Sequence, residues 1–539
     1  MRTYSLGHHQ RMYDNPVYRW RESLAIALSR MQTPPLHGYL AYRSIRNHLV
    51  EHGLSLVAGE ADAISTPDQR RALVRDQARM NQLIQDASRV PIDPGLEPVI
   101  LTGNELGLAD YFYWAFRIFG LNVKALALFY YSILFVSVVL FFMTFRRSPF
   151  CQLLLMLYLA GHLFAVNYAT IPLIQVIHNS RFFPVLALLP AMHILLLMLR
   201  REPASLANIL AAAGQAFILL FLMFCRSQVS WQVVAILASA LLVVRFRDVW
   251  RALPQPRHWP GTIATAARDT WPALLVLCGL AGYIAYSSRA PDPGFYGSES
   301  KTHVFWHTLY VGMISADREL TSRYGYGEEP YSDSMGYFAA MHDLRGRNEV
   351  PPGLAEVVDG VVNINILKST GAYDRVVRRI FFQVVAEHPW LVLRSFLVGK
   401  PKDQFSILFG ERAGQSTPVP KVPQLWDWRV YIEVLVLGSG ASLLALFAGA
   451  TFPHRNRLRE AAIALVPLVI CSAMTTLVVP SAVIPDVIVF YLVLVLLVTT
   501  YLPLALLSER LSATIAKRSA SSAPELEDGA ECKGPTSAA

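Results

Sequence analysis

The chain has 539 residues, of which 53% are hydrophobic and only 16% are charged, and its mean hydropathy is +0.36. Soluble domains carry about 25% charged residues, so this composition excludes an ordinary soluble protein. The net charge of +9 does not by itself indicate nucleic-acid binding, because membrane proteins concentrate Arg and Lys in their cytoplasmic loops. We therefore expect a protein that contacts membrane lipid and binds no nucleic acid.

Long apolar runs recur along the chain. A transmembrane helix needs about 20 predominantly apolar residues. On that criterion the candidate spans are 123–143, 149–169, 183–199, 205–225, 229–245, 271–288, 429–449, 460–480 and 487–507. The sequence therefore predicts an all-α, polytopic membrane protein with about nine to ten transmembrane helices.

These runs divide the chain into five predicted regions. In order they are an N-terminal outer or juxtamembrane region (1–122), a transmembrane bundle of about six helices (123–288), an outer, largely helical segment (289–428), a second bundle of about three helices (429–507) and a cytoplasmic tail (508–539). The tail is rich in small and polar residues, so we expect it to be disordered. STPVPKVPQ, just before the seventh span, predicts a stiff linker.

Basic residues are concentrated in alternate connections between the predicted spans. Clusters follow the odd-numbered spans, at 146–147, 200–201, 245–268, 455–459 and 510–518. Apart from the long segment 289–428, the other connections hold only Arg181 and Arg226. Because cytoplasmic loops carry the excess of Arg and Lys, the pattern predicts a cytoplasmic C-terminus and a multi-pass protein of a bacterial inner (plasma) membrane. Residues 289–428 are then expected outside, in the periplasm.

The same orientation places residues 1–122 outside, although no run in this region is long enough to span a bilayer. Its most apolar stretch, SLAIALS at 23–29, is far shorter than the required length. Two interpretations follow. Either a first span precedes the region, which we favour, or part of 92–120 enters the bilayer as a helical wedge.

Residues 374–400 in the outer segment have apolar residues at helical spacing with basic residues between them. Pro389 predicts a division into two helices. Amphipathic helices that carry basic residues and Trp commonly lie flat in the membrane interface, which is the interpretation we favour. In the alternative, the basic residues bind a lipid-linked phosphate by charge-assisted hydrogen bonds; they are Arg378, Arg379, Arg394 and Lys400.

The stretch HVFWHTLYVGMI, from residue 303, predicts another helix. At that spacing His303 and His307 share one face, and Trp306 and Tyr310 share an adjacent one. The zinc motif HExxH has a Glu between its histidines, which this stretch lacks. We therefore expect no metal and no other cofactor. Packing at the membrane interface is favoured, binding of a sugar or phosphate comes second, and a divalent metal site third.

The following stretch, SRYGYGEEPYSDSMGYF, predicts a loop because of its glycines, proline and serines. Its tyrosines, among them Tyr331, offer flat apolar faces with hydroxyls, which suit a sugar ring. Glu329 and Asp333 could take a proton from an acceptor hydroxyl. A solvated turn with tyrosines resting on the membrane interface explains the stretch equally well.

NELGLADYFYWAFRIFGLNVKALALFYYSILFV, residues 104–136, resembles a stretch of the GT-C superfamily of polytopic glycosyltransferases, in which an outer juxtamembrane helix with an FG turn leads into a span. The resemblance covers the chain from about residue 100 in outline and implies a polyprenyl-phosphate sugar donor. GT-C enzymes carry a catalytic acidic residue, often in a DD or DE pair, in the first outer loop. No such pair occurs between 30 and 122, and the nearest acidic candidates are Glu105 and Asp110.

The resemblance favours an enzyme that transfers a sugar from a polyprenyl-phosphate donor to a cell-envelope acceptor at the outer face. In this hypothesis an acidic residue deprotonates the acceptor and basic residues hold the lipid phosphate. The alternative is a non-enzymatic membrane factor with a degenerate GT-C-like fold, either a lipid-glycan flippase or an assembly scaffold. No Asp or Glu lies deep in a predicted span, which argues against an ion-coupled carrier.

Overall fold

The computed structural model describes most of the chain up to residue 402, with gaps. The described residues are 16–32, 41–54, 76–92, 106–148, parts of 151–162, 183–226, 229–243, 259–289, 305–328, 334–347, 355–358, 361–364, 370–400, 402 and 514. Over these residues the fold is mainly helical, as the sequence predicts. The predicted spans 429–449, 460–480 and 487–507, the proline-rich linker and nearly all of the tail lie outside them.

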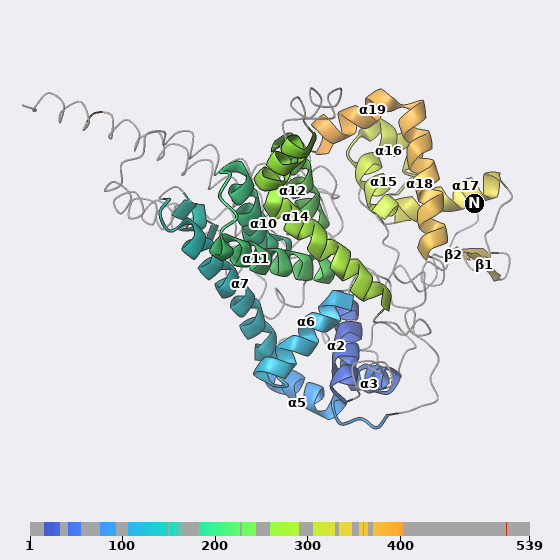
Figure 1. Cartoon of the computed structure of the whole chain (residues 1–539). Coiled ribbons are helices and arrows are strands. Elements are labelled where there is room, and N and C mark those ends of the chain that lie inside the picture. Colours follow the sequence, from blue (N-terminus) through green and yellow to red (C-terminus); the bar gives the residue numbers. More distant parts are fainter. Residues whose placement is uncertain are drawn as a thin grey trace, which may run out of the picture.

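Five long helices form a bundle (Figure 1). They are α7 (Val123–Phe145), α10 (Phe183–Leu199), α11 (Leu206–Cys225), α12 (Ser230–Val243) and α14 (Trp259–Arg289). The central helix is α10, which packs on the other four and is buried from Phe183 to Met198. Four of the helices have nearly the predicted bounds. The exception is α14, which begins twelve residues before the predicted start at 271, because its first turns carry polar residues that a hydropathy pattern passes over.

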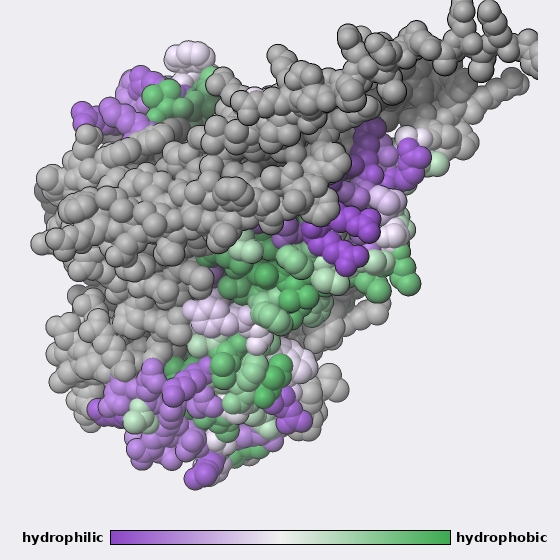
Figure 2. Space-filling model, turned by 90° about the vertical axis from the view of Figure 1, so that its left-hand side faces the viewer, coloured by the Kyte–Doolittle hydropathy of each residue, from purple (hydrophilic) through white to green (hydrophobic). Residues whose placement is uncertain are grey.

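Two helices in the described part of the chain, α7 and α11, are long and apolar enough to cross a membrane by length and composition. Each also presents apolar side chains at the surface. These exposed residues are Leu128, Phe135, Val136, Val139, Phe142 and Met143 on α7, and Leu206, Leu210 and Phe217 on α11. Figure 2 views the side on which α7 lies in Figure 1, and it shows a hydrophobic area between two hydrophilic ones.

The bundle has two chemically different ends. At one end Arg200 donates to the Ser148 hydroxyl at 2.9 Å, and Arg201 lies 3.7 Å from Asp269 of α14. At the opposite end the Cys225 thiol, which terminates α11, donates to the carbonyl of Gly107 at 3.1 Å. The arginines at 146–147, 200–201 and 268 thus lie at the same end of the bundle, away from the N-terminal helices.

The N-terminal helices pack against the second of these ends. They are α2 (Pro16–Gln32), α3 (Tyr42–Leu49), the π-helical turn η2 (Val50–Leu54), α5 (Gln77–Ala87) and α6 (Leu106–Phe119). The SLAIALS stretch lies within α2 and is almost completely buried against α3 and α6. Its apolar residues therefore form the core of a helical layer that is continuous with the core of the bundle.

Replacing Gly107 with alanine should separate α6 from the end of α11. A Cβ atom at this position would lie 2.5 Å from the backbone nitrogen of Cys225 and 2.5 Å from the carbonyl oxygen of Phe224. Backbone atoms cannot rotate away as a side chain can, and overpacking costs about 1–3 kcal/mol. We expect a lower Tm for the purified protein in detergent and faster proteolysis of its N-terminal helices.

Gly282→Ala provides the matched control. Gly282 lies in α14, and a Cβ there would meet nothing within 4 Å. Because alanine is the better helix former by about 1 kcal/mol, this variant should have an equal or higher Tm. Equal losses of Tm in the two variants would show that the close approach of α6 to α11 is not what the alanine disturbs.

A second group of elements lies beside the bundle in Figure 1 and has a hydrophobic core of its own. It contains α15 (Phe305–Ser315), α16 (Arg318–Tyr324), α17 (Ser334–Gly346), β1 (Ala355–Val358), β2 (Val361–Ile364), α18 (Thr370–Glu387), α19 (Pro389–Arg394) and the π-helical turn η7 (Ser395–Gly399). We call this group the α15–η7 unit. Residues 290–304, which connect it to α14, lie outside the described residues.

The α15–η7 unit confirms some local predictions and corrects others. Pro389 divides α18 from α19 as predicted, because the proline ring suits the first turn of a helix but not its interior. The all-α class is confirmed over the described residues, with one local addition that was not predicted: β1 and β2 form a short antiparallel hairpin with Val358 opposite Val361. The predicted loop at 322–338 was too long, because α16 continues to Tyr324 and α17 already begins at Ser334.

Candidate functional site

The predicted site residues fall into two groups. Five lie outside the described residues, and nothing in the structure tests them; they are Glu105, His303, Glu329, Tyr331 and Asp333. The others occupy two places in the fold. Asp110 lies in the N-terminal layer, and the remaining residues belong to the α15–η7 unit; these are Trp306, His307, Tyr310, Arg378, Arg379, Arg394 and Lys400.

Asp110 pairs with Arg30 across the contact between α6 and α2. The Arg30 guanidinium donates to Oδ1 of Asp110, and each side chain keeps 23% of its surface exposed. Burial raises the pKa of Asp110 above that of an ordinary aspartate, although the charge of Arg30 and its hydrogen bond act in the opposite direction. The site is thus a partly accessible carboxylate with increased basicity and a guanidinium beside it.

The local sequence fixes α6 at the start of α7. Gly120 adopts a φ of +86°, which glycine reaches without a steric penalty, and this turn ends α6. Asn122 caps the next helix by accepting from the Ala125 backbone N–H at 2.9 Å. The Asn81 side chain accepts from the N–H of Val123 at 2.8 Å, which ties α5 to the same point. Asp110 is therefore carried on a helix that is held rigidly against the bundle.

His307 is buried among aromatic side chains of α17 and α18. Its Nδ1 lies 2.6 Å from the hydroxyl of Tyr373, and its ring stacks on Tyr337 with centroids 5.2 Å apart. Gly336 is needed at this contact, because a Cβ there would collide with the imidazole ring and would lie 2.8 Å from the Tyr373 hydroxyl. No group of three or more His, Cys, Asp or Glu side chains in the described ranges could hold a metal ion.

Tyr373→Phe should destabilise the α15–η7 unit. The variant removes the partner of His307 Nδ1 at a buried position, and an unsatisfied buried polar group costs about 1–3 kcal/mol. The measurement is hydrogen exchange of α15 amides in the full-length protein. Tyr326→Phe is the control, because that side chain is exposed on the loop after α16. Unchanged exchange in Tyr373→Phe would mean that the His307 contact contributes nothing to stability.

Trp306 and Tyr310, predicted to lie at the membrane interface or in a sugar site, both have packing roles. Trp306 contacts the rings of Phe381 and Phe382 on α18, with ring centroids 5.5 and 5.1 Å apart. The Arg378 guanidinium lies over the Trp306 ring, 5.5 Å from its centroid. The backbone N–H of Trp306 donates to Asp374 at 3.0 Å. Tyr310 is fully buried, and its hydroxyl donates to the Tyr324 carbonyl at 3.0 Å.

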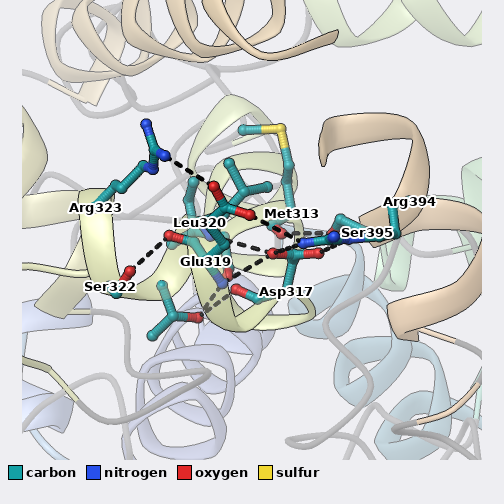
Figure 3. A network of polar contacts seen from close by, with 10 residues as sticks. Met313, Asp317, Glu319, Leu320, Ser322, Arg323, Arg394 and Ser395 are labelled. Atoms are coloured by element: carbon teal, nitrogen blue, oxygen red, sulfur yellow. Dashed lines mark hydrogen bonds and ion pairs between the residues drawn. The ribbon is translucent and has the colours of Figure 1, made fainter. Parts of the chain in front are cut away.

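A polar network joins α16 to α19 (Figure 3). Asp317 caps α16 by accepting from the N–H groups of Glu319 at 2.9 Å and Leu320 at 3.2 Å. The Arg394 guanidinium donates to both Asp317 oxygens, at 2.7 and 3.0 Å, and also to Glu319 at 3.4 Å. Ser395 donates to the Met313 carbonyl at 2.6 Å. The network therefore fixes α19 to the α15–α16 turn.

The four basic residues expected to hold a lipid phosphate make four different contacts. Arg394 binds Asp317 and Glu319, Arg379 pairs with Asp343 of α17, and Arg378 lies over aromatic rings. Lys400 is completely buried, with its ammonium 4.4 Å from the centroid of the Phe396 ring, and burial lowers its pKa to about 7. Phosphate binding by Arg379 or Arg394 would have to displace a carboxylate, so it stays a prediction without geometric support.

Sequence reasoning missed the partners that decide these contacts. The Asp317 cap was detectable, because an Asp directly before ELTSRY is a helix-start signal. Arg30 and Tyr373 carried no such signal, since they lie 80 and 66 residues from their partners. Comparison with known proteins adds no relative from which roles could be taken: no family model, no curated protein and no solved structure matches the chain.

Proposed function

We propose that the chain is a multi-pass protein of a bacterial plasma membrane that transfers a sugar from a polyprenyl-phosphate donor to a cell-envelope acceptor at the outer face. Asp110 is the general base in this proposal. The observation that carries it is the position of Asp110, a carboxylate of raised pKa beside a guanidinium, on the helix that adjoins the end of the bundle opposite the arginine-rich end.

The membrane assignment is supported by the surface of the bundle. Apolar side chains cover the outside of α7 and α11, where an ordinary soluble protein would present polar groups. The arginines at 146–147 and 200–201 lie together at one end, as expected if that end faces the cytoplasm. The N-terminal layer then lies on the outer side, where polyprenyl-linked sugars are used in the resembling superfamily.

The proposed chemistry assigns one task to each member of the Asp110–Arg30 pair. The Asp110 carboxylate accepts the proton of the acceptor hydroxyl, whose oxygen forms a bond to the anomeric carbon of the donor sugar. The bond between that carbon and the phosphate oxygen breaks, and polyprenyl phosphate leaves with the electron pair. Arg30 keeps Asp110 ionised and offers positive charge to the departing phosphate.

The interior of the described bundle gives less support to a flippase. Its buried polar groups in α7, α10 and α11 are neutral: Ser137 donates to Gln215 at 2.8 Å, and the Gln215 amide lies 3.1 Å from His193 Nδ1. A path for a charged headgroup needs charged or hydrated walls, because ionised groups are costly in an apolar interior. We therefore place transfer above translocation.

Purified full-length protein in nanodiscs tests the proposal. The probes are radiolabelled undecaprenyl-phosphate sugars, supplied singly with an envelope glycan extract as acceptor. We expect release of polyprenyl phosphate and transfer of label to the glycan with at least one donor. A strain that lacks the protein should also lose one envelope glycan. If no donor turns over and the deletion strain keeps a normal envelope, the enzymatic proposal is rejected.

A further inference from the structure

The helical stretch 389–400, formed by α19, η7 and Lys400, has one buried face and one exposed apolar face. One face belongs to the core of the α15–η7 unit: Val392 is 8% exposed, and Ser395 and Lys400 are fully buried. The other face carries large apolar side chains that are exposed. They are Trp390, 74% exposed, Leu393, 44%, Leu397, 59%, and Val398, 58%. We call these four residues the α19–η7 face.

The spacing of the four residues shows that they form one surface. Positions 390, 393 and 397 follow the three- and four-residue steps of a helix, and 398 adjoins them, so their side chains project to the same side. The face holds no acidic residue, and none occurs between 388 and 402. The polar side chain of Arg394 is held by Asp317 rather than covering the face. A soluble domain would rarely leave such a surface uncovered.

We infer that the α19–η7 face is a lipid-docking surface that lies in the membrane interface and seats the α15–η7 unit on the bilayer. We infer a bilayer as the partner of this face, because α7 and α11 of the same chain are long and apolar enough to cross one. The most exposed residue of the face is a Trp, which prefers the headgroup level. Exposed Lys402, which follows the stretch directly, adds positive charge that suits anionic lipids.

Residues 374–400 were interpreted either as interfacial helices or as ligands of a lipid phosphate. The inference keeps the interfacial interpretation and restricts it to residues 389–400. Only α19 and η7 present an extended apolar surface, whereas α18 buries Tyr373, Val377 and Val384 in the core. The Asp317–Arg394 contact holds α19 in the orientation that leaves its apolar side outward. The surface does not depend on the transferase chemistry, since it would serve a scaffold equally well.

Depth-dependent quenching in nanodiscs tests the inference. Single cysteines at Leu393 and Leu397, in full-length protein whose five native cysteines are replaced, would carry the fluorophore NBD. Interfacial helices lie about 5–10 Å into the headgroup and acyl boundary. We therefore expect lipids with a doxyl group near the headgroup to quench both labels more strongly than lipids with the doxyl near the chain end. A label at Ser322→Cys, on the side of α16 away from Arg394 (Figure 3), should be quenched by neither lipid.

Two results would overturn the inference. Absence of quenching at 393 and 397 would show that lipid does not reach the face. Energy transfer between labels on two copies in one nanodisc, without quenching by lipid, would make a second copy the occupant. Benzoylphenylalanine at position 397, in protein with its native cysteines, gives an independent measurement if the cysteine-free protein does not fold. A lipid adduct after irradiation supports the inference, and a protein adduct contradicts it.

Discussion

If Asp110 is the general base of the proposed sugar transfer, replacing it with asparagine should lower the rate by about 10²–10⁴-fold, the usual contribution of a general base. Asparagine has nearly the same shape and can still contact Arg30, but it cannot accept the acceptor proton. The measurement is single-turnover release of polyprenyl phosphate by protein in nanodiscs. The fold should be preserved, since the contact between α2 and α6 is largely apolar.

Asp86→Asn is the matched control, because Asp86 is an exposed aspartate on the neighbouring helix α5. It should transfer sugar at the rate of the unaltered protein.

The pH profile of the transfer rate gives a second readout. Burial raises the pKa of Asp110, and a base must be deprotonated to act. As pH is lowered, the rate should therefore begin to fall at a pH above about 3.9, the value at which an ordinary aspartate titrates. Full activity of Asp110→Asn would leave the residue a purely structural role.

Asp317→Ala should open the α16–α19 contact. Loss of a helix N-cap costs about 0.5–2 kcal/mol, and the same change removes the two Asp317 oxygens that accept from the Arg394 guanidinium and leaves only Glu319. Hydrogen exchange in the full-length protein is the measurement, with faster exchange expected in α16 and α19 and little change in α7. Asp317→Asn keeps an acceptor for the cap, so its exchange rates in α16 and α19 should lie between those of the unaltered protein and of Asp317→Ala. Uniform exchange changes across the chain would contradict a local effect.

The same carboxylate predicts a pH dependence. Burial alone would raise the pKa of Asp317, but hydrogen bonds from Arg394 and from two backbone N–H groups outweigh it, so the pKa lies below the ordinary value. A group whose pKa is lower in the folded state stabilises that state above its unfolded pKa, about 3.9. The stabilisation should be complete at neutral pH and disappear as pH falls below about 4. Asp317→Ala should lack this component of acid sensitivity.

The sequence by itself determined the helices of the bundle. Apolar runs of bilayer length placed α7, α10, α11 and α12 within a few residues, because each of these helices is apolar over nearly its whole length. Pro389 fixed the boundary between α18 and α19 for a local reason, the ring geometry of proline. The burial of SLAIALS and the hairpin of β1 and β2 were not predicted, because both depend on which segments meet.

Only the tertiary structure decided what the polar residues do. Arg394, a predicted phosphate ligand, binds Asp317, 77 residues earlier in the chain, and Asp110 is paired with Arg30, 80 residues away. A charge in a sequence has no assigned partner until the fold brings one within hydrogen-bonding distance. The apolar α19–η7 face is the converse case. The sequence predicted an interfacial helix for the whole stretch 374–400, and only the packing of Val392 and Ser395 on the opposite side shows which of its apolar residues are exposed.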